Sequence, residues 1–226
     1  MTRRDWMLLL ALSILWGGSF FFVEVALAGL PVVTIVWLRV ALAAAILGLV
    51  LIALRVPFPA RQVWPALLVM GGLNNAVPFT LFAVAQGEIT GALAAILNAT
   101  TPLFTVLVAH VATADERISR RKAAGLGFGF AGVVVMMAGA ELQGAVAAKL
   151  ACLLAALSYA CAGVWGRRFR ALWVAPLATA FGQVTAAAVI LLPVWLWLDA
   201  PWTLAWPGLR VAGAVLGIAA LSTALA

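Results

Sequence analysis

Residues Ser13–Arg39 read SILWGGSFFFVEVALAGLPVVTIVWLR, and this stretch decides how the rest of the chain is interpreted. It contains two apolar runs joined by a short Gly-Leu-Pro turn. Glu24 lies near the end of the first run, and Arg39 lies within the second. Ionisable groups are costly inside a lipid bilayer, so these two residues indicate either a functional site or a mutual pairing.

The composition predicts that the whole chain lies in a membrane. Of its 226 residues 66% are hydrophobic and only 9% are charged, and the mean hydropathy is +1.17. Soluble domains carry roughly 25% charged residues, and a water-soluble fold could not bury this much apolar surface. The expected partner of the chain is therefore the lipid bilayer.

The net charge of +7 does not indicate nucleic acid as a partner. The basic residues form short clusters between apolar runs, whereas a nucleic-acid-binding protein gathers them on one face or in a tail. The clusters are the pattern expected of loops beside a membrane.

Apolar runs of about 20 residues, the length that a helix needs to cross a bilayer, recur along the chain. We predict an all-α, polytopic membrane protein with spans at 6–28, 32–54, 64–85, 90–112, 122–140, 147–166, 174–198 and 208–226. The tripeptide Ala26-Leu27-Ala28 imitates a signal-peptide cleavage site, but further spans follow at once, so we expect the first run to be retained as a span.

The basic residues predict the orientation of these spans. The N-terminus and every second connection hold 11 of the 14 Lys and Arg residues: Arg3, Arg4, Arg55, Arg61, Arg117, Arg120, Arg121, Lys122, Arg167, Arg168 and Arg170. Cytoplasmic loops carry the excess of Lys and Arg, so we expect the N-terminus to be cytoplasmic.

Weak internal similarity indicates a repeated unit. Trp64-Pro65 matches Trp206-Pro207 at an offset of 142, Trp16 matches Tyr159 at 143, and Arg39 matches Gln183 at 144. The offsets predict a five-span unit that occurs twice, at 1–140 and, incompletely with three spans, at 147–226. Because five is odd, the second unit would enter the membrane from the opposite side, which is an inverted repeat.

The second unit stops in the middle of its third span. Residues 222–226, STALA, align with Thr80–Val84 at these offsets. We therefore expect a truncated chain that represents eight spans of a ten-span, 5+5 bundle.

Several motifs resemble those of the drug/metabolite transporter superfamily, and specifically of its EamA-type members. They are LWGGSFFFVEVAL at 15–27, Thr34 and Arg39, AVAQGEITGALAAILNATTPLFTVLVA at 83–109, the basic linker with Glu116, GLGFGFAGVVVM at 125–136 and LLAALSYACAGVWGRRF at 153–169. The resemblance implies a ten-span carrier with two five-helix halves in the bacterial inner (plasma) membrane. Members of this kind move amino acids, sugars, nucleotide-linked metabolites or drugs.

Glu24 and Arg39 have two interpretations. In the functional one, Glu24 is a proton or substrate-cation site and Arg39 contacts an anion. In the structural one, the two side chains form an ion pair that neutralises both buried charges and holds the first two helices together.

Trp16 belongs to a stripe with Ser13, Phe20 and Glu24, whose spacing of 3, 4 and 4 residues places them on one helix face. A polar and aromatic stripe at mid-membrane predicts that Trp16 lines a substrate cavity. The alternative is that the stripe serves helix packing and an interfacial belt.

Asparagines beside prolines mark two further candidate sites for substrate. Asn98 and Thr101 precede Pro102, which cannot donate a backbone hydrogen bond and so frees a carbonyl. Asn74 and Asn75 precede Pro78 in the same way. Freed carbonyls near polar side chains build binding sites in carriers, although such groups also join helices through hydrogen bonds.

From the second unit we expect Tyr159 and Gln183 to be the partners of these asparagines. With Trp16 they complete the residues predicted to bind substrate.

No cofactor or metal site is predicted. Residues 127–132 fit the letters of a dinucleotide-binding fingerprint but lie inside an apolar run with no preceding strand. His110 has no second ligand nearby in the sequence, and no catalytic dyad lies in the spans, so we expect no enzyme.

These features predict a secondary transporter, an exporter of small metabolites or drugs that works by alternating access between two inverted halves. One alternative is a proton-coupled antiporter of the small-multidrug type, an antiparallel homodimer in which Glu24 is the essential carboxylate. The other is a membrane fragment that transports nothing.

The predicted topology places residues 115–122 and 167–170 on the same, cytoplasmic side of the membrane. Single cysteines introduced in the two segments should react with a membrane-impermeant maleimide only after the membrane is opened. Labelling of the two segments from opposite sides would contradict the topology and the inverted repeat together.

Overall fold

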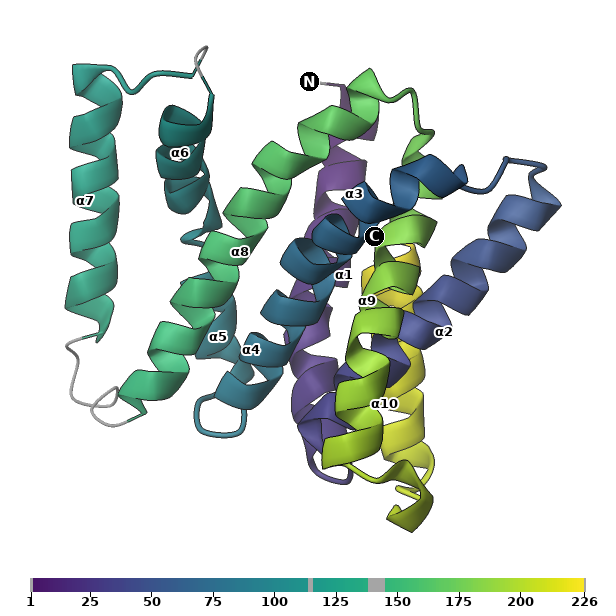
Figure 1. Ribbon diagram of the computed structural model, residues 1–226. Helices are drawn as coiled ribbons and strands as arrows, with labels where there is room; N and C mark the ends of the chain where they lie inside the picture. The colour runs from purple at the N-terminus through teal and green to yellow at the C-terminus, as the bar shows by residue number, and fades with distance from the viewer. Residues whose placement is uncertain (1, 114–115, 138–144, 226) are drawn as a thin grey trace.

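The computed structural model describes residues 2–113, 116–137 and 145–225. All regular elements in these residues are helical (Figure 1), as the lipid environment requires, because a helix satisfies its own backbone hydrogen bonds. The elements are α1 (Arg3–Leu27), α2 (Val32–Ala53), α3 (Trp64–Gly71), α4 (Val77–Ala85), α5 (Gly91–Asn98), α6 (Thr101–Ala112), α7 (Arg120–Met137), α8 (Val146–Ala171), α9 (Pro176–Leu198), α10 (Leu209–Ala219), the 3₁₀ turns η1 (Arg61–Val63) and η4 (Pro201–Thr203) and the π-helices η2 (Gly72–Ala76) and η5 (Ala220–Ala224).

Six stretches of the described residues are long and apolar enough to cross a membrane. They are 5–27, 32–53, 61–85, 91–112, 146–171 and 176–198, and each coincides with an expected span. The two remaining expected spans correspond to α7, with 18 residues, and to the shorter apolar stretch 209–224. Residues 138–140, where the fifth span and the first unit were expected to end, lie outside the described part.

The third span is not a uniform α-helix. A π-helix, η2, joins α3 to α4, and within it the Val77 N–H donates to the Gly72 carbonyl five residues earlier. Pro78 follows directly and has no N–H to donate. A π-helix contains one extra residue in the turn and is often found at functional sites.

The fourth span is broken between α5 and α6. The turn at 99–100 precedes Pro102, which occupies the first turn of α6 where its missing N–H costs nothing. The Thr101 hydroxyl donates to the Asn98 carbonyl at 2.7 Å. The carbonyl expected to be free near Pro102 is therefore satisfied locally.

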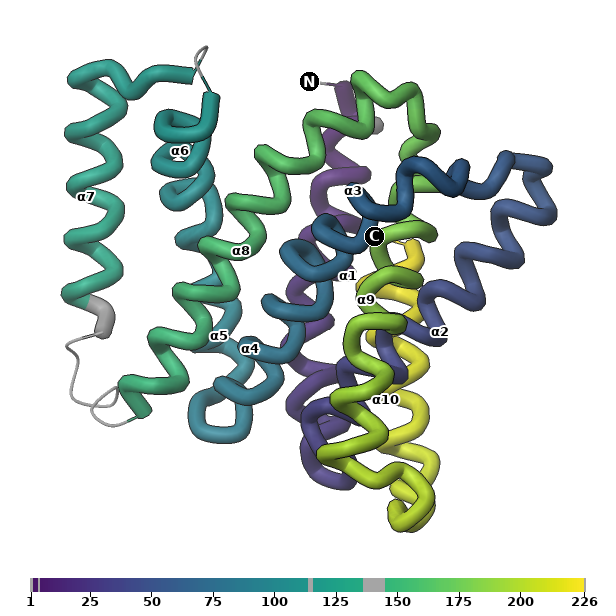
Figure 2. The backbone as a smooth tube through the Cα atoms, viewed as in Figure 1, coloured from purple at the N-terminus to yellow at the C-terminus, as the bar shows by residue number. Residues whose placement is uncertain are grey.

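The connections that carry most of the basic residues lie at one end of the bundle. Figure 2 shows the N-terminus and the α2–α3, α6–α7 and α8–α9 connections together at the upper end. The α1–α2, α4–α5 and α9–α10 connections lie at the lower end. We call the lower end the acidic end, because Glu88 and Asp199 belong to it.

The largest apolar cluster joins α1, α2, α4, α9 and α10. A second cluster packs α4 and α5 against α8. Tyr159 of α8 contacts both clusters and so lies between them. Helix α7 stands beside α6 at the edge of the bundle, where Leu103 and Phe104 of α6 meet Gly129 and Phe130 (Figure 1).

Gly71 and Gly72 provide a matched test of this packing. A Cβ atom on Gly71 would lie 2.5 Å from the Gln183 carbonyl oxygen and 2.8 Å from the Ala187 nitrogen, whereas a Cβ on Gly72 would have only Ile190 Cδ1 at 4.0 Å. Overpacking of this kind typically costs about 1–3 kcal/mol. Gly71→Ala should therefore lower the melting temperature of the protein in detergent, and Gly72→Ala should not. Equal melting temperatures for the two variants would contradict the close approach of α3 and α9.

Candidate functional site

Helices α2 and α9 lie against each other along their length, and aromatic and polar contacts join them at the acidic end. The indole rings of Trp37 and Trp195 stack with their centroids 3.7 Å apart. The Trp195 Nε1–H donates to the Thr34 hydroxyl at 3.0 Å, and Asp199 accepts from both the backbone N–H and the hydroxyl of Thr34, at 2.6 and 2.7 Å. Because Thr34 lies in the first turn of α2, the Asp199 carboxylate also meets the positive end of that helix.

The two π-helices lie deeper in the bundle and each contacts a long helix from the other part of the chain. Asn74 in η2 donates through Nδ2 to Gln183 Oε1 on α9, at 3.1 Å. Arg39 on α2 donates through Nε to the Thr223 hydroxyl in η5, at 2.8 Å. Asn74 and Gln183, which were expected to be partners, thus form a hydrogen bond. The contact of Arg39 with Thr223 likewise joins a long helix to a π-helix.

Helices α1 and α8 make a second related pair of contacts. The Ser158 hydroxyl on α8 donates to the Leu73 carbonyl in η2 at 2.7 Å. The Ser222 hydroxyl in η5 donates to the Leu15 carbonyl on α1 at 2.6 Å. In both cases a serine hydroxyl joins a π-helix to a long helix. The donor belongs to the long helix in the first contact and to the π-helix in the second.

The residues of these contacts form what we call the central cluster: Arg39, Asn74, Asn75, Phe79, Ser158, Tyr159, Gln183, Ser222 and Thr223. Arg39 is its charged member. Only 8% of its surface is exposed, and its guanidinium carbon lies 3.5 Å from the centroid of the Phe79 ring. The Tyr159 phenol lies within electrostatic range of the guanidinium. Tyr159 and Gln183, matched by offset to Trp16 and Arg39, thus both lie near or within the cluster.

Glu24 and Arg39 do not form the ion pair that was one of the two interpretations. The Glu24 carboxylate accepts from the Gly91 N–H at 3.3 Å, at the start of α5, whereas Arg39 bonds to Thr223. The two side chains bond to different elements, Glu24 to the start of α5 and Arg39 to η5. Within the described residues no ion pair joins them.

Gln86 lies beside Glu24 and was not predicted. Its side chain is 7% exposed, and neither Oε1 nor Nε2 has a hydrogen-bond partner in the described structure. A Cβ on Gly91 would lie 2.9 Å from Glu24 Oε2 and 3.0 Å from Gln86 Oε1, so Gly91 has no room for a side chain. We call these residues the Glu24 cluster: Glu24, which is exposed, and the buried Gln86 and Gly91.

The structure separates the other predicted residues into three environments. Asn75 is 3% exposed in η2 and its Oδ1 accepts no hydrogen bond in the described structure. Asn98 and Thr101 bond to each other at the α5–α6 turn, with Thr101 Oγ1 3.2 Å from Asn98 Oδ1. Trp16 is 58% exposed on α1, whereas its stripe partner Phe20 packs on Phe82.

Four members of the central cluster were not singled out from the sequence: Ser158, Ser222, Thr223 and Phe79. The predicted repeat aligned residues 222–226 with residues 80–84, which belong to α4. In the structure Ser222 and Thr223 instead lie in the π-helix η5, and the π-helix of the first unit is η2. The start of η2, residue 72, precedes the start of η5, residue 220, by 148 residues. The sequence feature that could have indicated Ser222 and Thr223 is that two hydroxyl side chains stand together within an apolar run.

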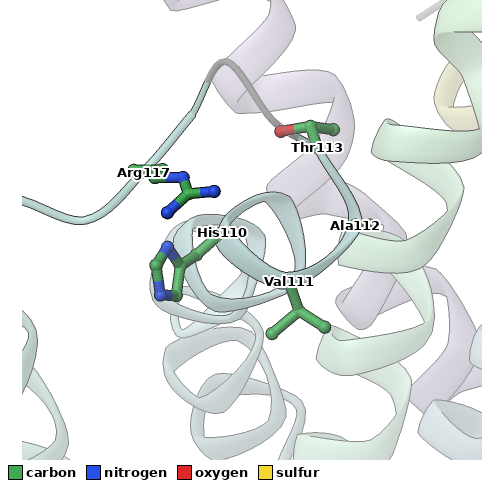
Figure 3. A pocket seen from close by; sticks show the side chains of 5 residues that line it. All are labelled: His110, Val111, Ala112, Thr113 and Arg117. Carbon is green, nitrogen blue, oxygen red and sulfur yellow. The ribbon is translucent and has the colours of Figure 1, made fainter.

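The end of α6 holds a shallow hollow of about 450 Å³ that is not part of these clusters. Figure 3 shows its lining, with the Arg117 side chain extending toward His110. The His110 Nδ1 accepts from the Ile118 N–H at 3.1 Å, and the described residues contain no group of three potential metal ligands. His110 therefore has a structural role in the α6–α7 connection.

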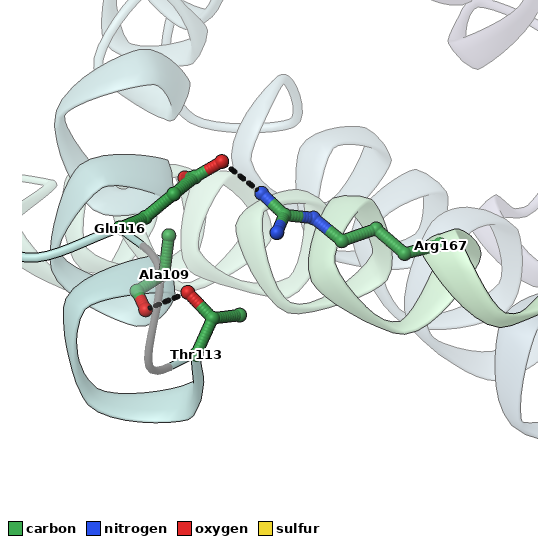
Figure 4. Close-up of polar contacts among 4 residues, drawn as sticks. All are labelled: Ala109, Thr113, Glu116 and Arg167. Atoms are coloured by element: carbon green, nitrogen blue, oxygen red, sulfur yellow. Dashed lines mark hydrogen bonds and ion pairs between the residues drawn. The ribbon is translucent and has the colours of Figure 1, made fainter.

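The same connection is bound to the end of α8. Figure 4 shows Glu116 paired with Arg167, while the Thr113 hydroxyl donates to the Ala109 carbonyl at 2.7 Å and ends α6. Both side chains of the pair are about half exposed, with 46% and 44% of their surface accessible. Exposed pairs of this kind contribute about 0–1 kcal/mol, so this one orients the loop more than it stabilises the bundle.

Comparison with known proteins agrees with this architecture. The chain is 30% identical over 188 residues to the "uncharacterized inner membrane transporter YedA" of Escherichia coli, in strain K12 and in O157:H7. The match covers 81% of this chain and 60% of YedA, so the chain spans about 60% of the length of the curated relatives it matches. A solved crystal structure is similar in fold, with a TM-score of 0.62 at 21% identity over 95% of this chain and 75% of that one.

The family model described as the EamA-like transporter family matches residues 5–138, which is more than half of the chain. This match agrees with the all-helical fold, the six long apolar stretches and the relationship to a protein named as an inner membrane transporter. The chain therefore belongs to the EamA-like transporter family, within the drug/metabolite transporter superfamily.

Proposed function

We propose that this chain acts in a secondary transporter that exports small metabolites or drugs across the bacterial inner membrane. Its two halves, 1–140 and 147–226, would rock against each other with opposite orientations, and the N-terminus would be cytoplasmic. The protein would move its substrate without chemical change, so no enzymatic step is part of the proposal.

The central cluster is the observation that carries this proposal. Asn74–Gln183 and Arg39–Thr223 both join one proposed half to the other, and both involve a π-helix. Hydrogen bonds between membrane helices average about 0.6 kcal/mol, which is weak enough to break and re-form during a transport cycle. A polar cluster at a weak interface between two halves is what alternating access requires.

We propose that substrate contacts come from Asn74, Asn75, Tyr159 and Gln183 of this cluster. The unpartnered Oδ1 of Asn75 supports this, because a buried acceptor without a donor is costly and a substrate N–H or O–H would satisfy it. Asn98, Thr101 and Trp16 remain candidates from the sequence, and they lie outside the hydrogen bonds that define the cluster.

The α2–α9 contact at the acidic end should behave as a gate. Stacking of Trp37 on Trp195 and the bonds of Thr34 with Asp199 hold the two helices together there. For a cavity between the halves to open at this end, those contacts must separate. Contacts within one half, such as Phe20 with Phe82, need not change.

A reversible cross-link tests the gate in the full-length protein. The transported compound is first identified by comparing the metabolites exported by cells with and without the protein. Trp37→Cys with Trp195→Cys, joined by a short bis-methanethiosulfonate reagent, should reduce export at least tenfold, and a reductant should restore it. Phe20→Cys with Phe82→Cys is the matched control and should export normally when joined. Full export by the joined 37–195 pair would contradict alternating access at this interface.

The Glu24 cluster favours a second candidate function, proton-coupled antiport of the small-multidrug type, with Glu24 as the essential carboxylate. Glu24 is held at the start of α5 by the Gly91 N–H, and the buried Gln86 amide beside it has no hydrogen-bond partner in the described structure. A carboxylate in this position could exchange a proton while its neighbours compensate for the charge. In the dimeric form of this candidate, a second copy of the chain is the partner.

Glu24→Gln separates the proton-coupled mechanism from one in which Glu24 is structural. In proteoliposomes with an imposed pH gradient, the variant should lose most of the gradient-driven transport while keeping exchange of substrate without a gradient. Glu88→Gln removes an exposed carboxylate from the same end of the bundle and should leave both rates unchanged. An unaltered gradient-driven rate in Glu24→Gln would remove Glu24 from either mechanism.

A further inference from the structure

Three oxygen atoms gather around Gly91, the first residue of α5. A Cβ atom on Gly91 would lie 2.9 Å from Glu24 Oε2, 3.0 Å from Gln86 Oε1 and 3.2 Å from the Phe20 carbonyl oxygen. Two of these oxygens come from α1 and the third from the residue that follows α4, so the packing of α1, α4 and α5 brings them together. Oxygen atoms that gather in this way repel one another unless a donor or a cation lies between them.

The Gln86 amide is the part of this group that the protein leaves unsatisfied. Gln86 is 7% exposed, and its Oε1 and Nε2 have no hydrogen-bond partner in the described structure. The Gly91 N–H, by contrast, donates to Glu24 Oε2 at 3.3 Å. A buried polar group without a partner costs free energy, and an apolar side chain of the same size would avoid that cost. An amide oxygen buried beside a carboxylate oxygen therefore indicates a ligand that both can bind.

The electrostatic surroundings favour a positive ligand. Glu24 lies in the last turn of α1 and Gln86 directly follows α4, and neither helix has a basic residue in its last turn. The C-terminal ends of helices carry partial negative charge, so two negative helix ends outweigh the positive N-terminal end of α5. Lys149 on α8 is 2% exposed, but no Lys or Arg in the described part of the chain forms an ion pair with Glu24.

The three oxygens also indicate the kind of cation. Carboxylate, amide and backbone oxygens suit hard ions, whereas His and Cys suit transition metals, and the described residues contain no group of three His, Cys, Asp or Glu side chains. Calcium takes about 6–8 oxygen ligands and usually several carboxylates. One carboxylate balances one positive charge, so the oxygens beside Gly91 match a monovalent ion.

We propose that Glu24, Gln86 and the Phe20 carbonyl bind a monovalent metal cation, sodium or potassium. Glu24 supplies the negative charge, the other two supply neutral oxygens, and water reaches the ion from the exposed side of Glu24. This ligand differs from the proton of the second candidate function, which Glu24 takes up alone. Binding of the metal does not depend on transport, whereas its exchange for substrate rests on the transport function proposed above.

Melting of the purified full-length protein tests binding directly. The protein is melted in detergent, at one pH and one ionic strength, in the chloride salts of sodium, potassium and the bulky cation N-methyl-D-glucamine. Sodium or potassium should raise the melting temperature by several degrees, and the larger shift identifies the ion. Equal melting temperatures in the three salts would overturn the proposal, even if a lower pH stabilises the protein. A larger shift with calcium or magnesium than with either monovalent metal would also overturn it.

Variants of the two side chains complete the test. Gln86→Leu removes the unpartnered amide without opening a cavity, so it should melt no lower than the wild type in N-methyl-D-glucamine and bind the metal at least tenfold more weakly. Glu24→Gln should bind it more weakly still. Glu88→Gln removes an exposed carboxylate close to Gln86 in the sequence and should keep the full shift.

Three results with these variants would contradict the site. A full metal shift in Gln86→Leu or in Glu24→Gln would show that the metal binds elsewhere. Loss of the shift in Glu88→Gln would show that the metal responds to the charge of this end of the bundle and to no particular site. Collapse of Gln86→Leu without metal would show that the amide has a structural role.

The export comparison distinguishes metal binding from transport. A metal shift that requires Glu24 and Gln86, with no export of any compound, would refute the proposed transport and leave the site intact. Export of a compound by a protein that melts equally in the three salts would refute the site and leave transport intact.

Discussion

The constraint on which this structure depends is that polar groups within lipid must find their partners inside the protein. Long apolar helices satisfy their backbones internally and leave few polar side chains to place. In this chain many of those side chains gather in two groups, the buried central cluster around Arg39 and the partly buried Glu24 cluster. Asn74 with Gln183, and Arg39 with Thr223, show how the first group joins distant parts of the chain.

The helices could be predicted from the sequence because length and hydropathy are properties of each run alone. The expected spans 6–28, 32–54 and 174–198 agree with α1, α2 and α9 to within a few residues, and α8 extends past its expected end through the basic residues 167–170. The offset of 144 pairs Gln183 with Arg39, and each of the two side chains bonds to a residue of a π-helix. Each of these predictions uses only distance along the chain.

The side-chain partners could not be predicted in the same way, because they depend on the rotation of each helix. Glu24 and Arg39 lie on consecutive helices, yet one bonds to α5 and the other to η5. Trp16 was predicted to line a cavity, and in the described structure its side chain is exposed. The two π-helices leave little mark in the sequence, and missing them shifted the alignment of residues 222–226 onto α4 instead of η2.

The π-helix η2 also determines what surrounds Arg39. An extra residue in an ordinary α-helix turns everything beyond it by about 100°. The wide turn of η2 holds its extra residue with little such rotation, so the face of α4 that carries Phe79 still meets Arg39. A lineage could therefore gain or lose that amino acid at η2 and keep the aromatic ring against the guanidinium.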